Sequence, residues 1–240
     1  MIPKIEFRYS WVYDNRYRES KKLQDILKKQ GKTYPSPEKI GKYIERIKQI
    51  WGRIEKKTLD KISRIYGLNW NEEKIKCYIV GFGRPFSDPL TMKLYNNKND
   101  FIDTLTHELM HQIQIQNSEK TKKWWKYIGD KYKSETILTK NHILLHAVHW
   151  QLYLDLYNKN RLEKEIKISG SYPDYKKSWE IVKREGYENI INEFKKRILG
   201  IDNENDVESI QEQFKNYLEN EFYDIFRDCR DSKNTRCFCT

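Results

Sequence analysis

Near the middle of the chain stands Asp103-Thr104-Leu105-Thr106-His107-Glu108-Leu109-Met110-His111-Gln112, a stretch that contains the pattern His-Glu-x-x-His. Two residues at i and i+4 lie on the same face of a helix, with their Cβ atoms roughly 5–6 Å apart. At this spacing the imidazole nitrogens of His107 and His111 can bind one zinc ion at about 2.0–2.1 Å each. Glu108 lies beside that face, so its carboxylate can contact a water molecule activated by the metal without itself binding the metal. The stretch therefore predicts a metal-binding helix that carries its own base.

The residues around the motif also favour a helix. Either Asn99 or Asp100 can cap its start. Apolar residues that can be buried occur on both sides of the histidines: Phe101, Ile102, Leu105, Leu109, Ile113 and Ile115.

All five histidines of the chain fall between His107 and His149. Those after the motif are His142, His146 and His149, and their spacings place them on one face of a second helix. A hydrolytic zinc site needs three protein ligands and one open position for water. The first helix provides two of these ligands, and the second helix can provide the third.

Length and charge set limits on the class of protein. The chain has 240 residues, a net charge of +11 and 34% charged residues, and a chain of this length can bury a sizeable core in one domain. The lysines are spread along the chain, which favours a solvated basic surface over a dedicated nucleic-acid site. Residues 1–8 contain no apolar run of signal-peptide length, and no later stretch reaches about eighteen uninterrupted apolar residues. We therefore expect a cytoplasmic protein with no membrane partner.

The four cysteines are Cys77 and a C-terminal group of Cys229, Cys237 and Cys239. Free thiols are the default in a cytoplasmic protein. A disulfide or a second metal site in the C-terminal group is the alternative. However, one residue separates Cys237 from Cys239, whereas common zinc modules use C-x₂-C, and no histidine is nearby. Free thiols therefore remain the expectation.

Before the motif, the residue pattern predicts five elements, which in chain order are a strand over 5–13, a helix over 19–29, a long amphipathic helix over about 36–66, and strands over 75–80 and 90–95. Ser36 is a suitable N-cap for the long helix, with Pro37 at its first position. The last two strands are joined by the loop 81–89, and we expect them to pair as an antiparallel hairpin just before the His107 helix.

After the motif, the pattern predicts helices over 118–133 and 134–157 and in most of the chain from 172 onward. The segment 118–133 interleaves lysines with Trp124 and Trp125. Tryptophans at helical spacing usually pack into a core, whereas aromatics interleaved with cations can bind a single-stranded nucleic acid. We expect the packing role for this segment and keep nucleic acid as the alternative.

The chemistry predicted for the site is hydrolysis. Zinc would lower the pKa of a water molecule from about 15.7 towards 7 and polarise the scissile carbonyl. Glu108 would take the proton of that water and pass it to the leaving amine. The oxyanion needs a further hydrogen-bond donor, for which Tyr153, His149 and Arg84 are the candidates.

These residues resemble a known family. The segment from His107 to His111, followed by Gln114, looks like the His-Glu-x-x-His-x-x-Gln pattern of the zincin metallopeptidases. The later run His146-Ala147-Val148-His149-Trp150 is similar to the segment that carries the third zinc ligand of SprT-like proteins, which have a glycine where this chain has Ala147.

The resemblance implies that His107, His111 and His146 bind zinc and that Glu108 is the catalytic base. It also implies an α+β, mainly helical fold with a zincin-like core. In that core a small antiparallel sheet lies beside the His-Glu-x-x-His helix, and one strand holds an extended substrate by β-augmentation. We expect one domain over residues 1–240, with the core at about 74–158, an N-terminal strand and helices over 1–73, and a C-terminal helical extension over 159–240.

Other ligand sets stay open. His142 and His149 are alternatives to His146, because helix geometry presents all three similarly. Glu135 is the candidate if the third ligand is a carboxylate, as in gluzincins. A metzincin would place glycine and histidine where this chain has Gln114 and Asn117, so that branch fits less well.

The sequence thus predicts a zinc-dependent metallopeptidase, an HExxH hydrolase with one zinc ion per chain that acts on a peptide or protein substrate. One alternative is a nucleic-acid-associated SprT-like protease, which the basic charge suggests and which would bind DNA in a salt-dependent way. The other is a non-catalytic helical protein in which a closed four-ligand zinc site only joins two helices.

Overall fold

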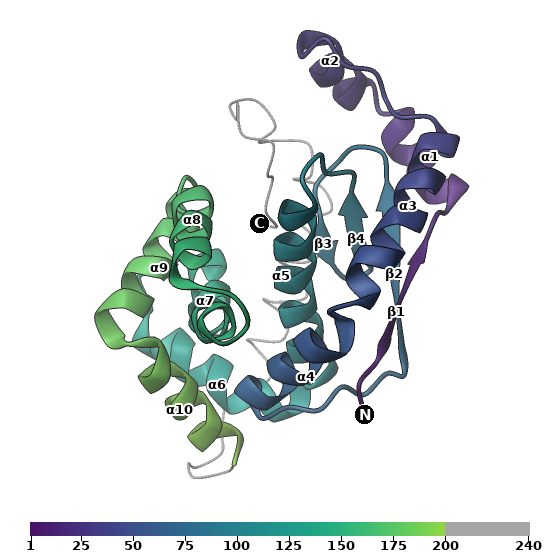
Figure 1. Cartoon of the computed structure of the whole chain (residues 1–240). Helices are drawn as coiled ribbons and strands as arrows, with labels where there is room; N and C mark the ends of the chain where they lie inside the picture. Colours follow the sequence, from purple (N-terminus) through teal and green to yellow (C-terminus); the bar gives the residue numbers. More distant parts are fainter. Residues whose placement is uncertain (200–240) are drawn as a thin grey trace. The chain divides into compact units, whose positions relative to one another are not determined.

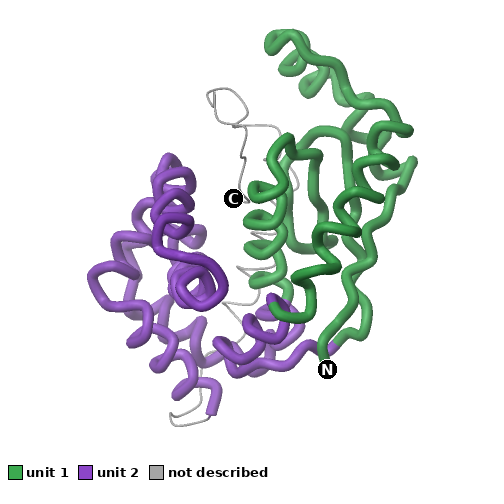
Figure 2. The backbone as a smooth tube through the Cα atoms, viewed as in Figure 1, with its two compact units in different colours: residues 1–57, 72–112, 220–240 green, residues 58–71, 113–219 purple. Residues whose placement is uncertain are grey.

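The computed structural model describes residues 1–199, which contain ten helices and four strands. This part of the chain divides into two compact units (Figure 2). Unit 1 comprises residues 1–57 and 72–112, and unit 2 comprises residues 58–71 and 113–199. The predicted C-terminal helix after residue 200 and the three C-terminal cysteines lie outside the described residues. No helix of the described part is both long and apolar enough to cross a membrane.

Unit 1 contains a four-stranded mixed sheet with the strand order β1-β2-β4-β3. Its strands are β1 (Lys4–Arg8), β2 (Lys74–Val80), β3 (Phe86–Ser87) and β4 (Leu90–Lys93). The pairs β1–β2 and β2–β4 are parallel, and only β3 runs antiparallel to β4. Residues 1–199 are therefore mainly helical with a small sheet, as predicted, but the sheet is mixed and not antiparallel.

The predicted hairpin between residues 75–80 and 90–95 is wrong for the same reason. The two segments do form strands, β2 and β4, but Tyr78 pairs with Thr91 in a parallel register. The intervening residues were predicted to be a loop, yet they include β3, which makes the tight reversal into β4. A two-residue strand has too little alternation to be recognised by its pattern.

The predicted opening strand over 5–13 ends early, because β1 stops at Arg8 and helix α1 (Trp11–Arg18) follows. Ser10 is the N-cap of α1, and its hydroxyl accepts a hydrogen bond from the backbone N–H of Tyr13 at 3.4 Å. A serine cap favours the helical conformation directly after it. Aromatic residues that suit a strand therefore form a helix here.

Three further helices follow before β2: α2 (Lys21–Lys29), α3 (Pro37–Gly52) and α4 (Glu55–Tyr66). The predicted cap of α3 is confirmed, since the Ser36 hydroxyl accepts from the N–H of Lys39 at 3.2 Å and Pro37 opens the helix. The predicted long helix is instead two helices, separated after Gly52. Glycine is a poor helix former, so Gly52 weakens the helix next to this break.

Helix α5 (Lys98–Gln116) carries the His-Glu-x-x-His motif. Its first turn is closed by Asn97, because the side chain of Asn97 accepts from the N–H of Asn99 at 2.8 Å and its carbonyl accepts from Phe101. The cap is thus Asn97 and not Asn99 or Asp100. Phe101 packs its ring against Phe7 of β1 and Tyr43 of α3, with centroids 5.9 Å apart in both pairs. The boundary between the units falls after Gln112, so that both units share α5.

Unit 2 is helical (Figure 1). Besides most of α4 and the end of α5, it contains α6 (Ser118–Lys131), α7 (Ile137–Leu156), α8 (Lys159–Ser169), α9 (Pro173–Glu185) and α10 (Tyr187–Ile198). Helix α7 is its centre: it packs against α8, α9 and α10, and residues 141–149 are all buried. A helix buried all round is a core helix. Trp124 of α6 is also buried and packs edge-on against Phe194 of α10 at 5.5 Å, which is the packing role predicted for it.

Candidate metal centre

The two histidines of the motif are neighbours on α5. The ring centroids of His107 and His111 are 5.0 Å apart, with 72° between the ring planes. His107 is buried and His111 is half-buried. Their proximity follows directly from the four-residue spacing, because both side chains leave the same face of one helix.

Glu108 is fully buried in the same turn of α5. Its carboxylate lies close enough to the thiol of Cys77 on β2 to act on it electrostatically. Burial, and to a lesser extent the Glu108 charge, raises the pKa of Cys77 well above its usual value. Cys77 therefore keeps its proton near neutral pH, and it is a free buried cysteine, as the sequence predicts for it.

His142 on α7 has a fixed tautomer. Its Nδ1–H donates a hydrogen bond to the carbonyl oxygen of Leu138 at 2.8 Å, which leaves the lone pair on Nε2. Burial lowers the pKa of His142 to about 4, although the Leu138 carbonyl and the charge of Asp174 act in the opposite direction. The side chain is therefore neutral near pH 7, and a neutral imidazole whose other nitrogen donates to a carbonyl is the form that binds metals.

His146 and His149 lie in the aromatic core of unit 2. The ring of His146 is stacked on Trp179 of α9, with centroids 3.9 Å apart and 3° between the planes. His149 packs edge-on against Tyr153 at 4.3 Å and lies 6.1 Å from Trp179. Both rings make extensive contacts with aromatic side chains, as buried histidines in protein cores often do.

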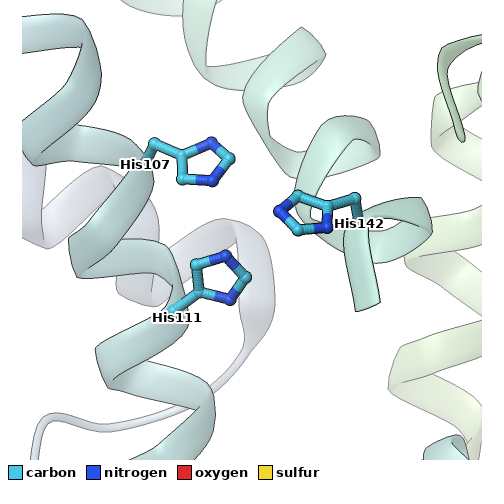
Figure 3. Close-up of side chains that lie close together, drawn as sticks. All are labelled: His107, His111 and His142. Atoms are coloured by element: carbon cyan, nitrogen blue, oxygen red, sulfur yellow. The ribbon is translucent and has the colours of Figure 1, made fainter. Parts of the chain in front are cut away.

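The structure brings three of the predicted candidates together: His107, His111 and His142 (Figure 3). Each offers one ring nitrogen, and these three nitrogens all lie within 4.8 Å of one another. Three nitrogen donors are a ligand set that zinc accepts in hydrolytic sites. This three-histidine group can hold a metal ion. The sequence predicts His142 as an alternative to His146, and the structure groups His142 with the pair on α5.

The carboxylate candidate and the oxyanion candidates lie outside this group. Glu135 forms an ion pair with Lys177 at 3.5 Å. Tyr153 is buried, with the guanidinium of Arg161 5.6 Å above its ring. Arg84 is buried in the segment between β2 and β3 of unit 1.

Several supporting residues were not identified from the sequence. Gln112, the residue after His111, donates a side-chain hydrogen bond to the Ser87 carbonyl of β3. Gln114, which contributed to the zincin resemblance, donates to the hydroxyl of Tyr66 at 3.0 Å. In both cases a side-chain amide of α5 forms a hydrogen bond that joins the helix to a distant segment of the chain. The motif spacing contains no signal for these partners, because each is at least 25 residues away in the sequence.

Tyr175 and Trp179 of α9 were also missed, although they contact all three histidines of α7. The ring of Tyr175 lies 4.3 Å from that of His142 and 5.6 Å from that of His146. Their four-residue spacing could have indicated an aromatic face directed at another helix. It could not have indicated which helix.

No family model, curated protein or solved structure matches this chain.

Proposed function

We propose that this protein is a zinc-dependent metallopeptidase with a zincin-like core, in which His107, His111 and His142 bind zinc and Glu108 is the general base. The observation that carries the proposal is the three-histidine group, whose nitrogens lie within 4.8 Å of one another. Two of these histidines flank Glu108 in the pattern His-Glu-x-x-His. That pattern combines metal ligands with a carboxylate one residue away, as metal-assisted hydrolysis requires.

The donor set fits zinc in its hydrolytic form. Three imidazole nitrogens leave one of the four usual positions open, whereas a structural zinc site uses four protein ligands. The hydrogen bond from Nδ1–H of His142 to Leu138 supports this assignment, because it places the lone pair of the ring on Nε2, the nitrogen that would bind zinc.

Zinc and Glu108 would have separate roles in the proposed hydrolysis. Zinc, when bound, supplies a Lewis acid that lowers the pKa of water and polarises a carbonyl. Glu108 accepts a proton from the attacking water as the water oxygen forms a bond to the carbonyl carbon. It then gives that proton to the amine nitrogen as the carbon–nitrogen bond breaks. The buried position of Glu108 favours this role, because its carboxylate is shielded from bulk solvent in the same helical turn as the two histidines.

The proposal rests on the three-histidine group and the α5 motif, and not on the SprT-like subfamily. That resemblance implied His146 as the third ligand, and His146 is stacked on Trp179. The grouping of His142 with the pair is thus a departure from the subfamily pattern.

The test is the substitution Glu108→Gln, which removes the base and keeps the size of the side chain. Purified full-length protein should contain about one zinc ion per chain in the wild type and in the variant. Cleavage of a fluorescence-quenched peptide library should fall by at least about a thousandfold in the variant. Glu135→Gln is the matched control, since it neutralises a carboxylate outside the histidine group and should cleave as the wild type does. A Glu108→Gln protein that cleaves at the wild-type rate would refute the proposal.

A further inference from the structure

Helix α1 in unit 1 combines a buried carboxylate with two exposed apolar side chains. Asp14 is fully buried, whereas Trp11 and Val12 are 61% and 70% exposed. The usual amphipathic helix buries apolar residues and exposes charges. Single exposed apolar residues need no explanation, but two adjacent large ones on the same helix that buries a carboxylate do.

The buried carboxylate explains how α1 is held in this orientation. Asp14 accepts hydrogen bonds from four groups: Arg18 Nη2 at 2.9 Å, the hydroxyls of Tyr34 at 2.5 Å and Tyr9 at 3.1 Å, and the backbone N–H of Gly81 at 2.9 Å. The charge of Arg18 compensates that of Asp14. A buried carboxylate with this many donors is strongly oriented, because losing any of them is costly in a site shielded from water. The network thus keeps Trp11 and Val12 directed to solvent.

The surroundings of Trp11 and Val12 are basic. Arg16 is exposed and follows Val12 by four residues, so the two side chains share one helix face. Residues 8–32 contain eight Lys and Arg residues against three Asp and Glu residues, which leaves a net charge of +5. Five of these cations lie exposed on or just after α2: Lys21, Lys22, Lys28, Lys29 and Lys32. Figure 1 shows α1 and α2 as neighbours at one end of unit 1.

The start of α1 adds a further attraction for anions. Trp11 and Val12 are the first two residues of this eight-residue helix, where backbone N–H groups point outward and the helix dipole is positive. The hydroxyl of Ser10 accepts a hydrogen bond from the N–H of Tyr13, and its carbonyl accepts one from the N–H of Asp14. The N–H groups of Trp11 and Val12 are therefore placed at the same exposed end as the two apolar side chains.

We propose that α1 docks this protein on an anionic lipid surface, with Trp11 and Val12 entering the boundary between headgroups and acyl chains. Tryptophan prefers that boundary, and valine gains free energy by leaving water. Arg16 and the lysines of α2 attract the lipid phosphates. A nucleic acid would account for Trp11 by stacking but not for Val12, so lipid is favoured. The proposal is independent of the zinc site. It differs from the expectation of no membrane partner, which rested on the absence of a signal-peptide-like run and of a spanning segment.

Co-sedimentation of the full chain with vesicles tests this proposal. Binding to phosphatidylcholine vesicles that contain phosphatidylserine should exceed binding to pure phosphatidylcholine vesicles by about tenfold or more. The double substitution Trp11→Ser with Val12→Ser should reduce binding to the anionic vesicles by about tenfold or more, and Arg16→Glu should reduce it less. Leu154→Ser is the matched control, because it removes an exposed apolar residue from unit 2 and should bind as the wild type does. All three variants change exposed positions, and circular dichroism should show that they fold.

Three results would overturn the proposal. The first is a wild-type protein that does not sediment with anionic vesicles. The second is binding that the Trp11 and Val12 double variant retains in full, which would indicate attraction by charge alone. The third is binding of a single-stranded oligonucleotide that depends on Trp11 but not on Val12, which would assign the surface to nucleic acid.

Discussion

Helices α5 and α7 carry histidines at the same spacing and yet present them differently. On α5 the ring centroids of His107 and His111 are 5.0 Å apart, and on α7 those of His142 and His146 are 5.4 Å apart. Both histidines of the α5 pair belong to the three-histidine group, whereas only His142 of the α7 pair belongs to it. The two rings differ in their surroundings: His146 is stacked on Trp179, whereas His142 is tilted against Tyr175 and donates its Nδ1–H to the Leu138 carbonyl. A four-residue spacing therefore makes two rings neighbours but does not determine the surroundings of each ring.

The largest expected effect comes from removing the stacking partner. Trp179→Ala should lower the free energy of unfolding by about 3–5 kcal/mol, because Trp179 is buried, lies against His146 and donates a hydrogen bond to the Ser169 hydroxyl at 2.7 Å. Urea denaturation monitored by circular dichroism measures the change. Trp11→Ala is the control, since Trp11 is exposed and its loss should change stability by less than about 0.5 kcal/mol. Equal effects at the two positions would show that the aromatic core does not hold α7 in place.

A smaller effect should separate the two histidines of α7. His142→Gln should weaken zinc binding by about a hundredfold or more, while His146→Gln should change it by less than about tenfold. The two positions lie on the same buried helix, so the variants are matched in their burial. Competition with a chromogenic chelator measures the zinc affinity of each folded variant. The reverse order of effects would make His146 the third ligand and restore the SprT-like assignment.

The smallest predicted effect concerns pH in the metal-free protein. His142 has a pKa of about 4 in the folded chain because it is buried, against a reference value of 6.5. The unfolded chain therefore binds a proton between these values that the folded chain does not, and stability falls as pH decreases. The loss between pH 7 and pH 5 should be on the order of 2 kcal/mol. Thermal unfolding of the chelator-treated protein measures it, and His142→Phe should show a shallower dependence. An unchanged slope in that variant would indicate that His142 is already protonated when buried.

Much of the helical structure could be predicted, because its signals are local. Ser36 followed by Pro37 marks the start of α3, and the apolar spacing of Ile40, Ile44 and Ile47 predicts its buried face, which all three occupy. The sheet was predicted less well. The parallel pairing of Tyr78 with Thr91 and the short strand at Phe86–Ser87 depend on contacts between segments. Strand pairing is a non-local property, and alternation of side chains does not distinguish parallel from antiparallel neighbours.

The candidate metal centre divides in the same way. The order of residues was sufficient to place His107, Glu108 and His111 on one helix, because helical geometry relates positions one to four residues apart. Only the packed chain selected His142 from the three histidines of α7. In the packed chain the Leu138 carbonyl orients the ring of His142, and Trp179 is stacked on the ring of His146. Trp179 lies more than thirty residues beyond His146, and no periodicity in the sequence predicts which distant side chain will be adjacent to a ring once the helices have packed.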